Sequence, residues 1–130
     1  MKKLVFLTML ITIVYSCNND NLESNQEEDG AKLEKMHSEI ITLSLANSQS
    51  CTNSEDWDFT GIGSRACGGF QAYIIYSKKI DTTQFLKKVK DYTDAQAAYN
   101  KKWGIASVCS VEIPPKKIEC VDGKPKAVYN

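Results

Sequence analysis

The longest periodic stretch of the sequence lies between Asp81 and Gly104, and it limits what the rest of the chain can form. Asp81 followed three residues later by Gln84 is an N-terminal capping signal, and Gly104 favours a left-handed C-cap. A helix between them would be about 33 Å long. Its large side chains recur every three or four residues and form one face, which we expect to be core rather than a ligand platform. They are Phe85, Val89, Tyr92, Gln96, Tyr99 and Trp103.

The segments on either side of this helix have the patterns of strands and of a second helix. Residues 57–64 alternate in side-chain character, and residues 73–76 are aromatic and β-branched, so both are predicted strands. Residues 118–121 and 124–129 flank Asp122-Gly123, a hairpin signal. Residues 31–44 place Leu33, Met36, Ile40 and Leu43 on one helix face, although the end of this segment also alternates as a strand would. The prediction is an α+β fold: one long helix packed on a small antiparallel sheet with a C-terminal hairpin, preceded by a shorter helix.

The N-terminus has the pattern of a secretory signal. Two lysines follow Met1, residues 4–15 carry no charge, and the small Ser16 precedes Cys17. The apolar run is shorter than the roughly 20 residues that a membrane span needs. With Val14, Ser16 and Cys17 it resembles the lipobox of bacterial lipoproteins. That resemblance implies removal of residues 1–16 as a signal peptide, and palmitate or a similar acyl chain on Cys17. The alternative is an ordinary signal peptide cut nearby, with Cys17 left as an odd thiol.

Residues 18–30 contain acids, no base and one apolar residue. Such a composition cannot bury enough apolar surface to offset its ordering entropy, so residues 17–30 are predicted to form a lipidated flexible tether. The acidic run also resembles the surface-export signal of Bacteroidetes lipoproteins; a solvated spacer is the alternative interpretation. Residues 31–130 then form one small domain, with a helix over 31–44 and a disulfide-stapled core over 51–130.

The remaining cysteines form an even set that suits two disulfides in an exported protein. A zinc site is the alternative, but no C-x-x-C pair exists and His37 is the sole histidine. If residues 57–64 form a strand, Cys51 and Cys67 lie at its opposite ends, too far apart to bond. The second strand and the long helix run out and back, which would return Cys109 to Cys67. We therefore predict the pairs Cys67–Cys109 and Cys51–Cys120.

Residues 51–129 resemble a group of small, uncharacterised exported lipoproteins of Bacteroidetes. The resemblance implies a location outside the cytoplasm and disulfide bonds, and it carries no catalytic residue. It rests on short motifs spread along the domain: Ala66-Cys67-Gly68-Gly69, Tyr73-Ile74, Tyr76-Ser77, Ile80-Asp81, Tyr92-Thr93, Tyr99-Asn100, Gly104-Ile105, Cys109-Ser110, Cys120 and Gly123-Lys124.

The sequence offers little catalytic chemistry. A hydrolase triad would need His37, which lies in the first predicted helix close to the tether. Cys67 beside Arg65 could be a reactive thiolate, although a disulfide is the favoured interpretation. Lysines near the long helix could form a basic face for anionic glycans or lipid headgroups, or could simply be solvated. The small excess of Lys and Arg after Cys51 lacks the concentrated basic surface of a nucleic-acid-binding protein.

These observations lead to two functional hypotheses for a chain that is not an enzyme and needs no metal or cofactor. In the first, the domain is held in the cell envelope by the lipid on Cys17, at the outer membrane or cell surface. There it acts as a non-catalytic binding or inhibitory module for a protein or glycan. In the second, it is a structural envelope component with no separate ligand.

Overall fold

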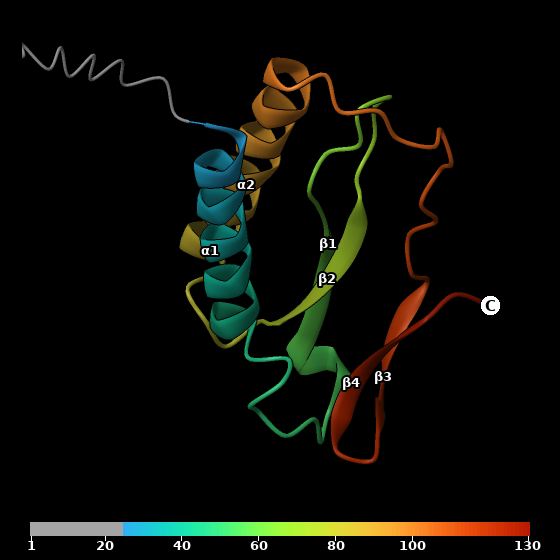
Figure 1. Cartoon of the computed structure of the whole chain (residues 1–130). Helices are drawn as coiled ribbons and strands as arrows, with labels where there is room; N and C mark the ends of the chain where they lie inside the picture. The colour runs from blue at the N-terminus through green and yellow to red at the C-terminus, as the bar shows by residue number, and fades with distance from the viewer. Residues whose placement is uncertain (1–24) are drawn as a thin grey trace, which may run out of the picture.

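The computed structural model describes residues 25–130, so the predicted signal peptide and Cys17 lie outside the described residues. The element order is α1 (Gln26–Ser44), the short 3₁₀ helix η1 (Ser54–Asp56), β1 (Trp57–Ile62), β2 (Ala72–Ser77), α2 (Thr82–Lys102), β3 (Lys117–Val121) and β4 (Lys124–Val128) (Figure 1). β1 pairs with β2 and β3 with β4, both antiparallel. The α+β prediction is therefore confirmed, including the long helix, the sheet and the C-terminal hairpin.

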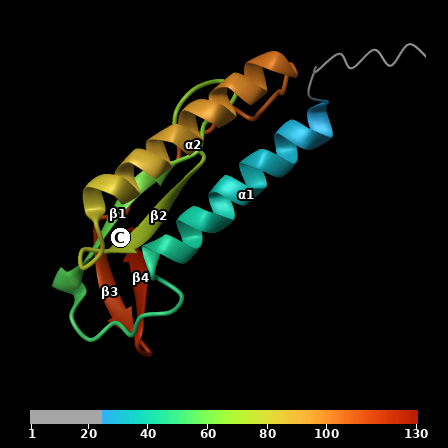
Figure 2. The ribbon, with the colours of Figure 1, turned by 90° about the vertical axis from the view of Figure 1, so that its left-hand side faces the viewer.

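The β1–β2 sheet is the middle layer of the fold. α1 and α2 run antiparallel to each other over one face, and the β3–β4 hairpin lies on the other side (Figures 1 and 2). Successive side chains of a strand point to opposite faces, so both faces of this sheet contribute to a core. Ile74 and Tyr76 pack in the cluster with the helices, whereas Trp57 and Ile75 pack in the cluster with the hairpin.

The inner cluster, between the helices and the sheet, confirms the first half of the predicted core face of the long helix; Gln96, Tyr99 and Trp103 of the second half are only half-buried and lie outside the cluster. Phe85, Val89 and Tyr92 of α2 are buried against Ile40 of α1 and the sheet. The rings of Tyr76 and Phe85 lie 4.9 Å apart. The α2 capping signals also work as predicted, because the side chain of Asp81 accepts from the backbone N–H of Gln84.

The outer cluster, between the sheet and the β3–β4 hairpin, contains the predicted disulfide between Cys51 and Cys120. Cys51, Trp57 and Ile118 are buried together there. The two cysteine Cα atoms are 5.3 Å apart, and the backbone N–H of Cys51 donates to the carbonyl of Gly123 at 2.8 Å. Positive φ angles at Asp122 and Gly123 match the tight turn that an Asp-Gly hairpin requires. The connection leaving α1 is thereby fixed to the hairpin.

The prediction of a flexible tether through residue 30 is wrong for its last residues, because α1 begins at Gln26. The Asn25 side chain accepts from the backbone N–H of Glu28 at 2.8 Å and caps the helix. The three acids of the first turn also interact favourably with the helix dipole. One of them, Asp29, accepts from Lys102 Nζ at 2.7 Å and from Trp103 Nε1 at 3.2 Å. The acidic composition predicts a disordered segment, whereas in the structure these acids form the first turn of a helix.

α2 ends where the sequence predicts, and its end sets the course of the next segment. Gly104 has a φ of 59°, and the N–H of Ile105 donates back to the carbonyl of Asn100 at 2.9 Å. This is the hydrogen-bond pattern of a Schellman cap. The chain then runs without regular structure through residues 105–115 to β3; Pro114 and Pro115 lack the backbone N–H that a helix would need there.

Candidate functional site

The predicted partners Cys67 and Cys109 lie next to each other at the end of the sheet remote from Cys51–Cys120. Cys67 is in the β1–β2 loop and Cys109 is in the segment after α2. We call this the open end of the fold, and the end with Cys51–Cys120 the closed end. Both thiols are free and exposed, and each is close enough to shift the pKa of the other. The two cysteines lie together as predicted, but the expected second covalent bond is absent.

The β1–β2 loop is held in shape by α2. The N–H of Gly63 donates to Thr93 Oγ1 at 3.0 Å, and the N–H of Ser64 donates to Gln96 Oε1 at 2.7 Å. Asn100 closes the series by donating from Nδ2 to the carbonyl of Ser64 at 2.8 Å. Gln96 was predicted to belong to the core stripe, and it instead fastens a loop. A polar residue within an apolar stripe was the available signal for this role.

Arg65 connects that loop to the segment after α2. Its Nε donates to the carbonyl of Phe70 at 3.1 Å, which fixes the guanidinium within its own loop. Nη1 donates to Ser110 Oγ at 2.6 Å, and Nη2 pairs with Glu112 Oε2 at 2.8 Å. The Arg65 side chain is only 17% exposed, so this contact is better shielded than a typical surface ion pair. No local sequence pattern predicts this contact, because the partners lie more than 40 residues away.

The segment held by Arg65 exposes three apolar side chains. Val108, Val111 and Ile113 are 81%, 90% and 67% exposed, the largest values among the exposed large hydrophobic residues of the described chain. Ser110 and Glu112 turn toward Arg65, so the alternation of an extended chain directs Val111 and Ile113 away from the fold. Across residues 106–115 the described structure has no backbone–backbone hydrogen bond. We call Val108, Val111 and Ile113 with this backbone the apolar strip.

A cavity of about 640 Å³ opens beside the strip. It lies among the start of α1, the end of α2, the β1–β2 loop and residues 105–108. Its size falls in the range of small-ligand pockets. Its lining mixes polar and apolar side chains and includes Leu33, Gln71, Gln96, Tyr99, Ile105 and Val108.

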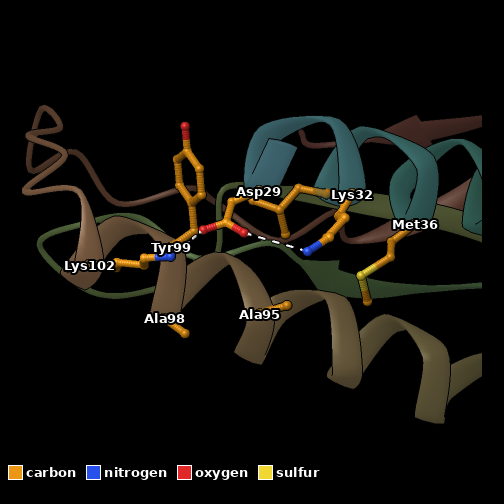
Figure 3. A pocket seen from close by; sticks show the side chains of 8 residues that line it. Asp29, Lys32, Met36, Ala95, Ala98, Tyr99 and Lys102 are labelled. Carbon is orange, nitrogen blue, oxygen red and sulfur yellow. Dashed lines mark hydrogen bonds and ion pairs between the residues drawn. The ribbon is translucent and has the colours of Figure 1, made fainter. Parts of the chain in front are cut away.

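A second cavity, of about 300 Å³, lies between the two helices (Figure 3). Ala95 and Ala98 leave room opposite Met36, since their side chains are short. Asp29 bounds one end and pairs with Lys102 at 2.7 Å and Lys32 at 3.8 Å. A carboxylate engaged by two ammonium groups is committed to joining the helices rather than to acid–base chemistry.

The environment of Cys67 favours its thiolate. The pKa of the Cys67 thiol is lowered, chiefly by the hydrogen bond from Cys109 and also by Ser107 and by the charge of Arg65. The Ser107 hydroxyl lies 3.5 Å from the Cys67 sulfur. The pKa of Cys109 is raised, because it donates that hydrogen bond and would share the site with a second negative charge. The two thiols are therefore chemically unequal.

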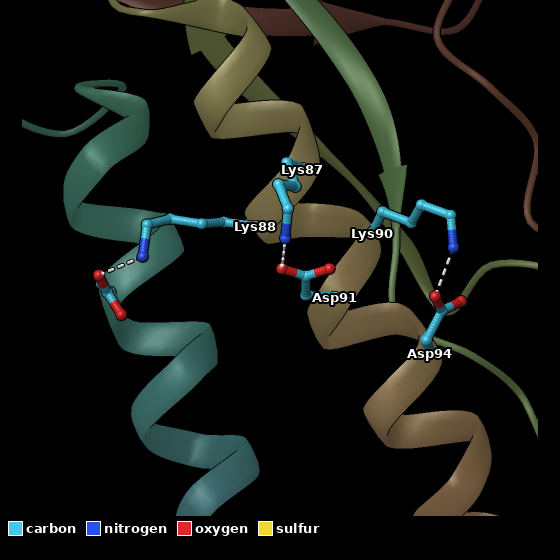
Figure 4. Close-up of polar contacts among 6 residues, drawn as sticks. Lys87, Lys88, Lys90, Asp91 and Asp94 are labelled. Atoms are coloured by element: carbon cyan, nitrogen blue, oxygen red, sulfur yellow. Dashed lines mark hydrogen bonds and ion pairs between the residues drawn. The ribbon is translucent and has the colours of Figure 1, made fainter.

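The lysines of α2 do not form a free basic face. Lys87 pairs with Asp91, Lys90 with Asp94 and Lys88 with Glu39 of α1 (Figure 4). Further along the surface, Lys79 pairs with Asp56. Neighbouring carboxylates offset most of the positive charge that the sequence suggested for binding anionic glycans or headgroups.

Other candidates are not assembled into a site. His37 is half-buried, with its ring 5.4 Å from that of Tyr92. Among the described residues no group of three or more histidines, cysteines or acids is placed to hold a metal ion. Over the same residues, neither helix has an apolar stretch that could cross a bilayer.

Comparison with protein-family models, curated proteins and solved structures finds no match to the chain.

Proposed function

We propose that this chain is a lipid-anchored, non-catalytic binding module of the bacterial cell envelope, and that the apolar strip contacts a protein partner. The observation that carries the proposal is the strip itself. Large apolar side chains that are fastened in place yet left exposed mark interaction surfaces more often than isolated surface residues do. Val108, Val111 and Ile113 are such a group, and Arg65 fastens the segment that presents them.

The backbone of the strip favours a protein partner over a glycan. Its peptide groups have no backbone partner within the described chain, and its side chains alternate between the fold and solvent. An extended peptide that pairs with such a segment gains main-chain hydrogen bonds as well as apolar contacts. The partner we expect is an uncharged, apolar, extended segment of another envelope protein.

The proposed location in the cell envelope rests on the sequence of residues 1–17. Acylation of Cys17 would supply stable anchoring when at least two chains are attached. The outer membrane, with exposure at the cell surface, is the location we propose. A Cys17→Ser variant should leave the membrane fraction and lose labelling by a palmitate analogue. If that variant still partitioned with membranes, the anchor would have to lie elsewhere.

The strip can be tested with displayed peptides. Extended peptides selected on the immobilised full chain should bind wild-type protein at least tenfold more tightly than a Val108→Ser/Val111→Ser/Ile113→Ser variant, because each substitution removes exposed apolar area. A Leu43→Ser variant serves as the matched control, since Leu43 is 39% exposed on α1, away from the strip. Amide hydrogen exchange should slow across residues 106–113 when peptide is bound.

Two outcomes would contradict the protein partner. One is peptide binding that the triple variant leaves unchanged, or protection that lies outside residues 106–113. The other is strip-dependent binding to phospholipid vesicles without peptide binding, which would make the bilayer the surface that the strip contacts.

A further inference from the structure

We propose that Cys67 and Cys109 form an exchangeable dithiol–disulfide site, in which Cys67 is the attacking thiol and the substrate is a disulfide from outside the chain. This inference is independent of the apolar strip and of its partner. It assigns to the pair a redox role beyond that of a structural staple.

The first step in the argument is access. Cys67 and Cys109 are both exposed, whereas Cys51 of the bonded pair is only 3% exposed. Thiol–disulfide exchange needs in-line approach of one sulfur to another, so exposed sulfurs exchange and buried ones resist. The chain therefore contains one pair that an external disulfide can reach and one that the core protects.

The second step is the mutual placement of the two thiols. Each thiol shifts the pKa of the other, so the two are neighbours, and the hydroxyl of Ser107, two residues before Cys109, lies 3.5 Å from the Cys67 sulfur. The N–H of Cys67 donates to Ser107 Oγ at 3.4 Å, which holds the Cys67 backbone against the segment that carries Cys109. Arg65 fixes the same two segments through Ser110 and Glu112. The pair is thus held in place whether or not a bond links it.

The third step is the difference between the thiols. The Cys67 sulfur accepts a hydrogen bond from the Ser107 hydroxyl, and the positive charge of Arg65 is nearby. Hydrogen-bond donors and a cation stabilise a thiolate, which is the nucleophile in exchange. The pKa of Cys109 is raised, so this thiol keeps its proton while Cys67 reacts.

The exchange then proceeds in two displacements. The Cys67 thiolate attacks one sulfur of the external disulfide; that disulfide bond breaks, a mixed disulfide with Cys67 forms, and the first external thiolate leaves. Cys109 loses its proton to solvent and attacks the Cys67 sulfur, which expels the second external thiolate. The protein loses two electrons and two protons and gains the Cys67–Cys109 bond, and the external disulfide is reduced to two thiols.

A glutathione titration tests the exchange. The full chain with Cys17→Ser is equilibrated in buffers of increasing reduced-to-oxidised glutathione ratio, trapped with acid and a maleimide, and digested with trypsin. The four cysteines then fall on separate peptides, 36–65, 66–78, 103–116 and 118–126, so each pairing is read directly by mass. The link between 66–78 and 103–116 should form and open reversibly at ratios that leave the link between 36–65 and 118–126 intact.

Single substitutions test the assignment of the attacking thiol. Cys109→Ser keeps a hydroxyl donor beside Cys67, and this variant should form the mixed disulfide with glutathione about tenfold faster at pH 7 than Cys67→Ser does at Cys109. Arg65→Lys preserves the charge and should retain most of the rate. Equal rates at the two thiols would overturn the assignment. Opening of both disulfides at one glutathione ratio, or failure of the 67–109 link to form, would overturn the exchangeable site itself.

Discussion

The two ends of the central sheet hold the chain together by different means. At the closed end a covalent bond joins Cys51 to Cys120 inside an apolar cluster with Trp57 and Ile118. At the open end Cys67 and Cys109 meet as exposed thiols, and side-chain hydrogen bonds of Arg65 and Gln96 hold the loops. The difference shows that a small domain can close one end with a buried covalent bond and hold the other with polar side chains, which leaves apolar side chains exposed there.

The largest expected difference between the two ends is in stability. The Cys51–Cys120 bond closes a loop of 69 residues, and removing it with Cys51→Ala/Cys120→Ala should lower the free energy of unfolding by about 4 kcal/mol. Cys67→Ala/Cys109→Ala, compared in a weakly reducing buffer that keeps the exposed pair as thiols, should change it by less than about 0.5 kcal/mol. Urea unfolding of both variants measures the contrast, and equal losses would remove the distinction.

A core substitution sharpens the same comparison without changing a cysteine. Ile40 is 1% exposed between the helices and the sheet, so Ile40→Ala should cost about 3 kcal/mol in unfolding free energy, from lost transfer energy and an unfilled cavity. Val111→Ala at the open end should cost close to nothing, because Val111 is 90% exposed. A substantial loss from Val111→Ala would mean that the strip packs against the domain.

The third contrast concerns the start of α1: residues 26–30 are either a capped helix turn or part of a flexible tether. Asn25→Ala removes the side chain that accepts from Glu28 N–H and should cost about 1 kcal/mol of unfolding free energy. Amide exchange in residues 26–30 should accelerate more than exchange in α2. Asn25→Asp, which preserves a capping oxygen, is the matched control. An unchanged exchange pattern in Asn25→Ala would restore the original interpretation of residues 26–30 as tether.

The smallest expected effect is a loss of stability at alkaline pH that depends on a tyrosine in the helical core. Burial raises the pKa of Tyr92 above the ordinary value of a tyrosine, so folding favours the neutral phenol. The stability this contributes is present below the unfolded pKa and is lost as pH rises through the folded pKa. Tyr92→Phe cannot ionise, and its unfolding free energy should fall less steeply above pH 10 than that of the wild type. Parallel pH profiles for the two proteins would contradict this.

Much of the fold was predictable because it depends on local signals. The α2 stripe, its caps, the strand patterns and the Asp-Gly turn each act within a few residues, and each is present in the structure. The start of α1 was missed because Asn25 and the acids that follow have the composition of a disordered segment. Their role as a cap depends on the apolar face farther along the same helix, and on Trp103 and Lys102 from α2.

The open end was less predictable than the fold. Cys67–Cys109 proximity followed from the lengths of the intervening elements. The contacts of Arg65 with Ser110 and Glu112, and of Gln96 with the β1–β2 loop, depend on loops meeting in space, and no sequence period encodes them. The exposure of Val108, Val111 and Ile113 was also not predictable, because an apolar side chain in a loop could equally well pack at the edge of the core.

The early start of α1 has a consequence for reach. If Cys17 carries the lipid, only the seven residues 18–24 separate it from the Asn25 cap. Even a fully extended chain of that length covers only about 25–30 Å. The start of α1 lies at the same end of the molecule as the end of α2, where the segment bearing the strip begins (Figure 1). The strip would then sample a shallow layer above the bilayer, so a partner must itself reside at the membrane or approach within a few nanometres of it.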